Sequence, residues 1–201
     1  GSILRAVELP TGGGGDTAFC NLAAVYASFD EGTQQLLGGL QTTNDWLNVF
    51  GGQMPPESLA TFRADLPRVT HPLVRTHPET KNKHLFYSIP FVLGLNGLTR
   101  PMSQSWMQHF VALINTLEFQ CRISWEPGTV VMWDNRSVQH YAPNDYLPQR
   151  RRMERVTIKG DTPVGDGPPP PPVLGGVVPR NTAESVGGDC SEVGAVRAME
   201  N

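Results

Sequence analysis

Four short apolar segments lie between residues 119 and 159, and this series constrains the fold more than any other feature of the chain. In the first segment, apolar residues alternate with polar ones before a Glu126-Pro127-Gly128 turn. Such alternation is typical of a strand that is buried on one side only. The other segments cover residues 129–133, 138–142 and 153–159. Short strands separated by turns predict an antiparallel sandwich.

The remaining elements are grouped apart from these strands. Strands are expected at residues 3–9, 71–76 and 84–88, the last two joined by a polar turn at 78–83. Helical spacing of apolar residues predicts helices over 21–40, with a break near 30–32, over 55–66, and over 102–117. The fold class is therefore mainly β with helices, an α+β arrangement.

Composition limits the classes of function. A chain of 201 residues can form one sizeable core, and a net charge of −3 gives no overall field that favours nucleic acid or anionic membranes. No apolar run approaches the roughly 18 residues of a membrane helix. The three cysteines are far apart, which favours a reducing, cytoplasmic location over a disulfide framework. We expect no nucleic-acid or membrane partner, and homo-oligomerisation stays open.

Two glycine- or proline-rich stretches need an interpretation. Gly12 to Gly15 are followed by Asp16-Thr17 and not by the Lys-Ser/Thr of a phosphate-binding loop, so a tight turn between strands is favoured. Residues 162–201 contain the proline run 168–172 and few large apolar residues. This composition predicts a disordered tail, with a polyproline II ligand for a partner domain as the alternative.

The arginines at residues 150–155 suggest an anion site. On an extended strand Arg151, Met153 and Arg155 share one face. Two guanidinium groups facing the inside of a sandwich are costly unless they meet anions, and their fork geometry suits carboxylates or sulfonates. The alternative is a solvated basic edge strand that opposes aggregation. The pattern alone leaves both interpretations open.

His140 is a candidate metal ligand. It follows Val138 at a spacing of two, so a neutral imidazole can face a core, although a lone histidine there is more often a hydrogen-bonded core residue. A site of two histidines and one carboxylate usually draws two ligands from an H-x-D/E pair. The chain has one such match, His77-Pro78-Glu79. It lies in a polar hairpin turn, where we expect both side chains to face water, so we reject it as a ligand pair.

One block of residues resembles a known family. Trp133-Asp134-Asn135-Arg136 through His140, followed by Arg151 to Arg155, is similar to the C-terminal two-thirds of the TauD/TfdA family of Fe(II)- and 2-oxoglutarate-dependent dioxygenases. The likeness extends to residues 3–10, 14–17 and 71–78. It implies a double-stranded β-helix, or jelly-roll, whose N-terminal part is missing. Residues 1–161 would form this partial domain, and 162–201 the Pro/Gly-rich tail.

The resemblance also implies roles for individual residues and three small molecules: Fe(II), 2-oxoglutarate and O2. His140 matches an iron ligand, and no further catalytic residue is implied. The residues matched to 2-oxoglutarate are Thr17 and Arg151, and those matched to the substrate are Phe50, Phe91 and Arg155. Arg155 would hold the anionic head of the substrate, between aromatic walls formed by the two phenylalanines.

The implied activity is hydroxylation of a small anionic substrate, foremost a sulfonate such as taurine, with release of sulfite, an aldehyde, succinate and CO2. In the family, the other two iron ligands form an H-x-D motif upstream of the strand that begins here at Ile3, and this chain does not contain it. The alternative is therefore a non-catalytic fragment, or an anion-binding protein of the same fold without iron chemistry.

Overall fold

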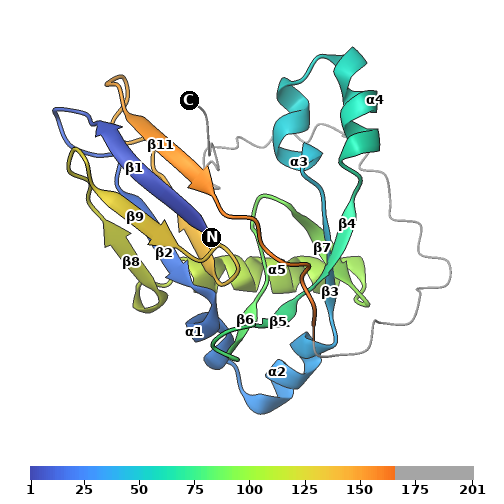
Figure 1. Ribbon diagram of the computed structural model, residues 1–201. Helices are drawn as coiled ribbons and strands as arrows, with labels where there is room; N and C mark the ends of the chain where they lie inside the picture. Colours follow the sequence, from blue (N-terminus) through green and yellow to red (C-terminus); the bar gives the residue numbers. More distant parts are fainter. Residues whose placement is uncertain (166–201) are drawn as a thin grey trace.

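The computed structural model describes residues 1–165, and two three-stranded antiparallel sheets dominate one side of it (Figure 1). The first, here the β1 sheet, has the order β11 (Arg152–Thr157), β1 (Ser2–Glu8), β9 (Val130–Trp133). The second, the β2 sheet, has the order β10 (Val138–Tyr141), β2 (Thr17–Asn21), β8 (Gln120–Ile123). All four pairings are antiparallel, as the alternating segments predict.

The register of the strands determines which side chains lie between the two sheets. Residues directly opposite each other in an antiparallel pair share a face. His140 lies opposite Phe19 in the β2 sheet, and Trp133 lies opposite Ser2 in the β1 sheet. The rings of Phe19 and Trp133 are 5.2 Å apart between centroids, so the inner faces of the sheets meet there. This arrangement agrees with the predicted sandwich, whereas a complete jelly-roll stays a prediction.

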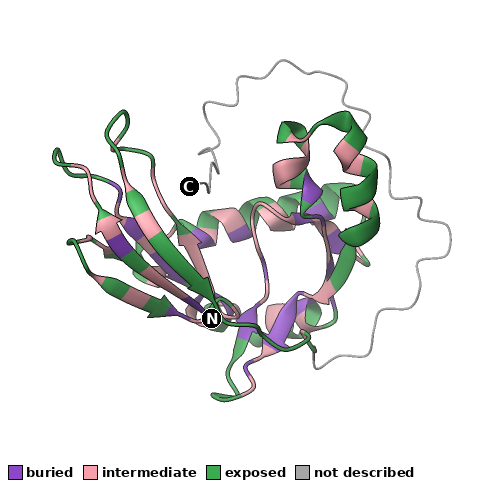
Figure 2. Cartoon of the chain, turned by 45° about the horizontal axis from the view of Figure 1, so that its top comes forward, coloured by how far each residue is buried: buried purple, intermediate pink, exposed green. Residues whose placement is uncertain are grey.

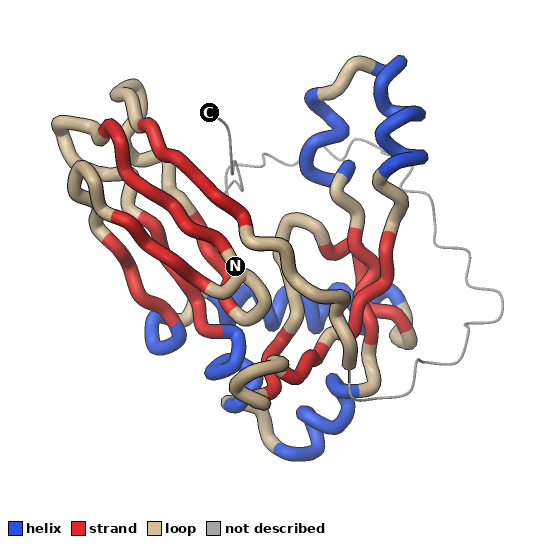
Figure 3. Tube along the Cα trace, viewed as in Figure 1, coloured by secondary structure: helices blue, strands red, loops and turns tan. Residues whose placement is uncertain are grey.

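The other side of the molecule combines a third sheet, a hairpin and helices (Figure 3). The third sheet has the order β4 (Val69–Pro72), β3 (Gln41–Asn44), β7 (Val92–Asn96), and β5 (Val74–Thr76) pairs with β6 (Lys83–Leu85). The helical elements are α1 (Leu22–Ala27), α2 (Glu31–Gly38), α3 (Leu47–Phe50), η1 (Gly51–Gln53), α4 (Pro56–Asp65), α5 (Arg100–Ile114) and η2 (Leu117–Phe119). The α3–α4 segment projects at the top of Figure 1.

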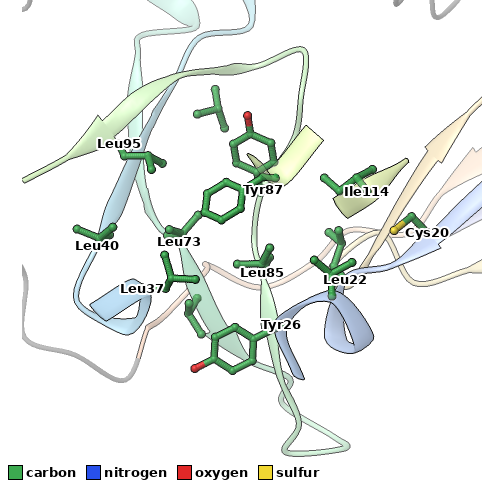
Figure 4. Close-up of a cluster of buried hydrophobic side chains, with 14 residues drawn as sticks. Cys20, Leu22, Tyr26, Leu37, Leu40, Leu73, Leu85, Tyr87, Leu95 and Ile114 are labelled. Carbon is green, nitrogen blue, oxygen red and sulfur yellow. The ribbon is translucent and has the colours of Figure 1, made fainter. Parts of the chain in front are cut away.

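A single apolar cluster holds this second side together. Phe110 of α5 is fully buried, and the rings of Phe29, Tyr87 and Trp106 surround it at 5.3 to 6.3 Å. Figure 4 shows that the cluster extends from Leu95 to Cys20 on β2, next to the sandwich. In contrast, α4 has no buried residue, and it is coloured mainly as exposed in Figure 2. The core therefore fixes the base of the α3–α4 segment and leaves its tip in contact with solvent.

The start of α1 is stabilised by a side-chain cap. The Asn21 Oδ1 atom accepts hydrogen bonds from the backbone N–H groups of Ala23 and Ala24 at 3.0 and 3.2 Å. These groups have no partner inside the helix. Replacing Asn21 with alanine is expected to lower the free energy of unfolding by about 1 kcal/mol. Urea denaturation measures the loss, and Asn21→Asp should restore most of it; equal losses in both variants would contradict the capping role.

The structure corrects several details of the sequence-based prediction. The sequence pattern did not predict β3 and β7. The helix expected over 102–117 ends at Ile114 as α5, and the two ends of its apolar stripe, Met102 and Leu117, are exposed, with Leu117 in η2. Residues 162–165 contain no helix or strand, and the rest of the predicted tail lies outside the described residues. Within residues 1–165, no helix has the length and apolar character needed to cross a membrane.

Candidate active site

A cavity of about 750 Å³ lies where the sandwich meets the α3–α4 segment. It brings together four residues predicted from the sequence: Phe50, Phe91, His140 and Arg155. His140 comes from the β2 sheet and Arg155 from the β1 sheet, so the contact between the two sheets is what places them together. The size lies within the range of small-molecule sites.

The imidazole of His140 is held in an aromatic environment. Its ring centroid lies 5.0 Å from that of Trp133 and 6.3 Å from that of Phe19. Burial, assisted by the positive charge of Arg155, lowers the pKa of His140 from 6.5 to about 4. At neutral pH the ring is therefore uncharged and keeps a nitrogen lone pair, which is the form that binds a metal ion.

This lowered pKa predicts how stability depends on pH. The folded chain binds the His140 proton less readily than the unfolded chain, so the free energy of unfolding falls as the pH drops below 6.5 and levels off near 4. Burial lowers the pKa of His71 and His84 as well, so these two residues also reduce the free energy of unfolding as the pH falls.

Urea denaturation at pH 7.5, 6 and 4.5 measures this loss. His140→Gln, which cannot take up the proton, should reduce the loss between pH 7.5 and 4.5 by about 2 kcal/mol. An identical pH dependence in both chains would contradict the assignment to His140.

Arg155 provides the positive charge of the cavity. It lies on β11 opposite Leu4 of β1, lines the cavity and is exposed to solvent. Its Nη2 atom donates to the Ser2 hydroxyl at 3.2 Å. The neighbouring Arg152 is exposed and pairs with Glu154, as expected for a solvated edge strand. The strand therefore combines both interpretations left open by the sequence: Arg155 faces the cavity, and Arg152 faces solvent.

Arg151 lies directly before β11 in a separate buried position. Its Nε and Nη2 atoms are buried and have no hydrogen-bond partner among residues 1–165. Its Cζ atom lies 5.8 Å from the ring centroid of Tyr146, and burial lowers the pKa of Arg151. Because a buried guanidinium without an acceptor is costly, this position fits an anionic ligand.

Gly15 makes room for the Arg151 side chain. A Cβ atom at Gly15 would lie 2.8 Å from the Arg151 Cδ atom, and the φ angle of +72° also favours glycine. Thr17 follows two residues later and is buried, and its hydroxyl accepts a hydrogen bond from the Trp125 ring at 3.0 Å. Neither Thr17 nor Arg151 lines the large cavity, so the predicted residues fall into two groups.

The expectation that both His77 and Glu79 face water is wrong for His77. The His77 ring is buried, and its Nε2 atom lies 3.0 Å from the Asp134 Oδ2 atom, while Glu79 is exposed. These three residues offer ligand atoms within 4.8 Å of one another. However, Arg136 Nη2 donates to both carboxylates at 2.6 Å, and it lowers the pKa of each. The cluster is therefore an ion-pair network, in which both carboxylates pair with the permanently charged Arg136 guanidinium and not with a metal ion.

Sequence reasoning missed several residues of the cavity wall. Trp46 stacks on Phe50 at 4.4 Å between centroids, and Phe50 lies 6.3 Å from Phe91. His71, Phe86 and Tyr87 also line the cavity. Trp46 lies four positions before Phe50 in the sequence, whereas His71 lies on β4 and Phe86 follows β6.

Comparison with known proteins identifies the family. The model of the family described as taurine catabolism dioxygenase TauD, TfdA family matches residues 1–157, which is most of the chain. The chain belongs to the TauD/TfdA family. This result confirms the resemblance seen in the Trp133–His140 block and in the arginines that follow it.

Characterised members of the TauD/TfdA family share about a third of the residues. An α-ketoglutarate-dependent sulfate ester dioxygenase from Pseudomonas putida is 34% identical over 82% of this chain and 56% of its own length. An alkylsulfatase from Acinetobacter baylyi is 34% identical over 82% of this chain and 53% of its own. The crystal structure of a taurine dioxygenase from Burkholderia xenovorans has a TM-score of 0.70 and 34% identity, over 82% and 54% of the two chains. The chain thus spans about half the length of these relatives.

The α-ketoglutarate dependence in the name of the Pseudomonas putida relative implies iron. A facial iron site needs two histidines and one carboxylate. His140 offers one neutral imidazole. Among residues 1–165 the one group of three or more potential ligands is that of His77, Glu79 and Asp134, whose two carboxylates already pair with Arg136. The described residues alone therefore do not fit an iron centre.

Proposed function

We propose that this chain is the anion-binding part of an Fe(II)- and 2-oxoglutarate-dependent dioxygenase with a double-stranded β-helix fold. The observation that supports this proposal most directly is the shared cavity of His140 and Arg155. A neutral imidazole and a guanidinium on facing sheets would place a substrate anion beside a metal-binding position. Family membership gives the expected reaction type, and the names of the relatives agree with it.

Each of two arginines would bind one of the two anions, the substrate and 2-oxoglutarate. Arg155 would pair with the substrate anion in the open cavity, because it is the arginine that lies beside His140. Arg151 would pair with the distal carboxylate of 2-oxoglutarate, because its buried donors lack an acceptor within residues 1–165. The Thr17 hydroxyl would assist the same carboxylate. Both pairings use the planar fork of the guanidinium group.

The cavity wall supports a substrate with an apolar portion. The rings of Trp46, Phe50, Phe86 and Phe91 line a space of about 750 Å³, more than a two-carbon sulfonate such as taurine would fill. We therefore propose a sulfonate or sulfate ester with an alkyl or aryl group, with taurine as a smaller member of the same class. Hydroxylation of a sulfonate beside sulfur would release sulfite and an aldehyde, while 2-oxoglutarate and O2 become succinate and CO2.

Succinate formation tests the proposal. The chain is incubated with Fe(II), ascorbate, 2-oxoglutarate and O2, together with taurine, hexanesulfonate or hexyl sulfate. Succinate produced well above the level of a His140→Ala variant supports a dioxygenase. The six-carbon substrates are expected to give more succinate than taurine. Equal succinate yields from the three substrates, all well above the level of His140→Ala, would contradict the proposed role of the aromatic wall.

The second candidate function is anion binding without iron chemistry. It is favoured because neither of the histidines that line the cavity, His71 and His140, belongs to a group of three potential metal ligands among the described residues. This candidate would be favoured if the chain bound hexyl sulfate but formed no more succinate than the His140→Ala variant.

A cytoplasmic location is also part of the proposal, since the two cysteines described, Cys20 and Cys121, are free thiols. Homo-oligomerisation stays a prediction.

A further inference from the structure

A chain of hydrogen bonds connects the two ends of the candidate site. The Trp133 ring nitrogen donates to Asn135, and the Asn135 amide nitrogen lies 2.8 Å from the Ser2 hydroxyl oxygen. The same oxygen lies 3.2 Å from the Arg155 Nη2 atom. The chain thus begins at the ring that packs on His140 and ends at the guanidinium of the cavity.

The direction of each hydrogen bond in this chain is fixed by chemistry. An indole nitrogen and a guanidinium can only donate. Trp133 therefore selects the carbonyl oxygen of Asn135, which turns the amide N–H toward Ser2. The Ser2 oxygen then accepts one bond from Asn135 and one from Arg155, which uses both of its lone pairs.

Burial and strand position make this arrangement specific. Ser2 is fully buried, so water does not compete for its oxygen, and Trp133 is only 8% exposed. Ser2 lies on β1, the central strand of its sheet, with β9 on one side and β11 on the other. It is opposite Trp133 on β9 and opposite Thr157 on β11, two residues from Arg155. A side chain at this position can reach both neighbouring strands.

We propose that Ser2 and Asn135 are positioning residues that hold the Arg155 guanidinium and the Trp133–His140 ring pair in one fixed arrangement. The inference rests on the proposed function, because it assumes that Arg155 binds the substrate anion. The two residues would set the distance between the anion and His140, and hence which substrate carbon lies near the metal-binding position. Sequence position alone does not suggest this link, since Ser2 and Asn135 are 133 residues apart.

Affinity measurements on the chain test this role with hexyl sulfate as the probe for Arg155 and 2-oxoglutarate as the probe for Arg151. Ser2→Ala is expected to weaken hexyl sulfate binding roughly tenfold, the scale of one lost hydrogen bond to a charged group. Its 2-oxoglutarate affinity should stay within about twofold of the unmodified chain, because the Ser2 hydroxyl bonds to Arg155. Asn135→Ala should act in the same direction, and the double variant should bind no more weakly than Ser2→Ala, since both belong to one chain of bonds.

A matched control separates positioning from general destabilisation. Ser103→Ala removes another buried serine hydroxyl, one that accepts from the Leu95 backbone at 2.8 Å outside the cavity. It should lower stability without changing either affinity. NMR of the Arg155 guanidinium adds a direct readout: its N–H signals should broaden in Ser2→Ala and Asn135→Ala, and stay unchanged in Ser103→Ala.

The outcomes separate this inference from the proposed function. Weaker hexyl sulfate binding in Ser2→Ala and Asn135→Ala, with 2-oxoglutarate binding and the Ser103→Ala control unchanged, supports the positioning role. Unchanged hexyl sulfate binding in both variants, together with a large loss in Arg155→Gln, overturns the positioning role and leaves the function of Arg155 intact. Unchanged binding in Arg155→Gln overturns both.

Discussion

Arg155→Gln is expected to weaken binding of hexyl sulfate or hexanesulfonate about 100-fold, while binding of 2-oxoglutarate changes less than about twofold. The guanidinium of Arg155 lines the cavity beside His140, and it can donate two parallel hydrogen bonds to a sulfonate or sulfate group. Glutamine keeps a donor and much of the length, but it lacks the charge and the planar fork. Isothermal titration calorimetry of the chain with each ligand measures the difference.

Arg150→Gln is the matched control for this experiment. Arg150 is five residues away, its side chain is 74% exposed, and it pairs with Glu8 on the surface. The same substitution there removes the same charge from the chain without touching the cavity, so ligand affinity should change little. If Arg150→Gln and Arg155→Gln weakened binding equally, net charge and not a specific anion site would explain the effect.

Arg151→Gln is expected to show the opposite selectivity, with a loss of about 100-fold for 2-oxoglutarate and little change for hexyl sulfate. The Arg151 donors are buried without an acceptor within residues 1–165, so an incoming carboxylate would satisfy groups that water cannot reach. NMR titration with 2-oxoglutarate, and with succinate as a second dicarboxylate, measures the affinities. Both acids should be affected alike, because they share the distal carboxylate.

The Arg151 substitution has a second expected consequence, for stability. Because two buried nitrogen atoms of the charged side chain, Nε and Nη2, have no hydrogen-bond acceptor within residues 1–165, its removal should leave the free energy of unfolding unchanged or raise it. A large loss of stability in Arg151→Gln would show that the guanidinium already has a structural partner, and would contradict its assignment as a ligand-binding group.

The sandwich could be predicted from the sequence because short strand-like segments are separated by turns. The segment that became β8 alternates apolar and polar residues, and the one that became β9 is a short apolar run, Val130-Val131-Met132-Trp133. Strand β3 gave no such signal, since Gln41-Thr42-Thr43-Asn44 is entirely polar and is held by its neighbours β4 and β7. Its burial at Thr42 depends on pairing with residues 29 and 53 positions away, which local patterns do not encode.

The sequence named charged residues of the candidate site and two of its aromatic walls, Phe50 and Phe91, and missed other wall residues such as Trp46 and Phe86. The Trp133–His140 block and the arginines after it have a recognisable spacing, so His140, Arg151 and Arg155 could be named in advance. Trp46 precedes α3 and Phe86 follows β6, and only the folded chain brings both to the cavity. The prediction that His77 faces water was wrong because a polar turn suggested exposure, whereas the half-buried Asp134, 57 residues away, provides a partner for the buried ring.

The strand order of the β2 sheet has a consequence for how further chain could join the molecule. Within residues 1–165, β10 pairs with β2 on one side only, so the backbone groups along its other edge are open to an added strand. A strand pairing there would point every second side chain to the face that holds His140. One added segment with ligand residues at a spacing of two could thus place both of them beside the imidazole. Extension of the sheet and completion of a metal site would then be the same structural event.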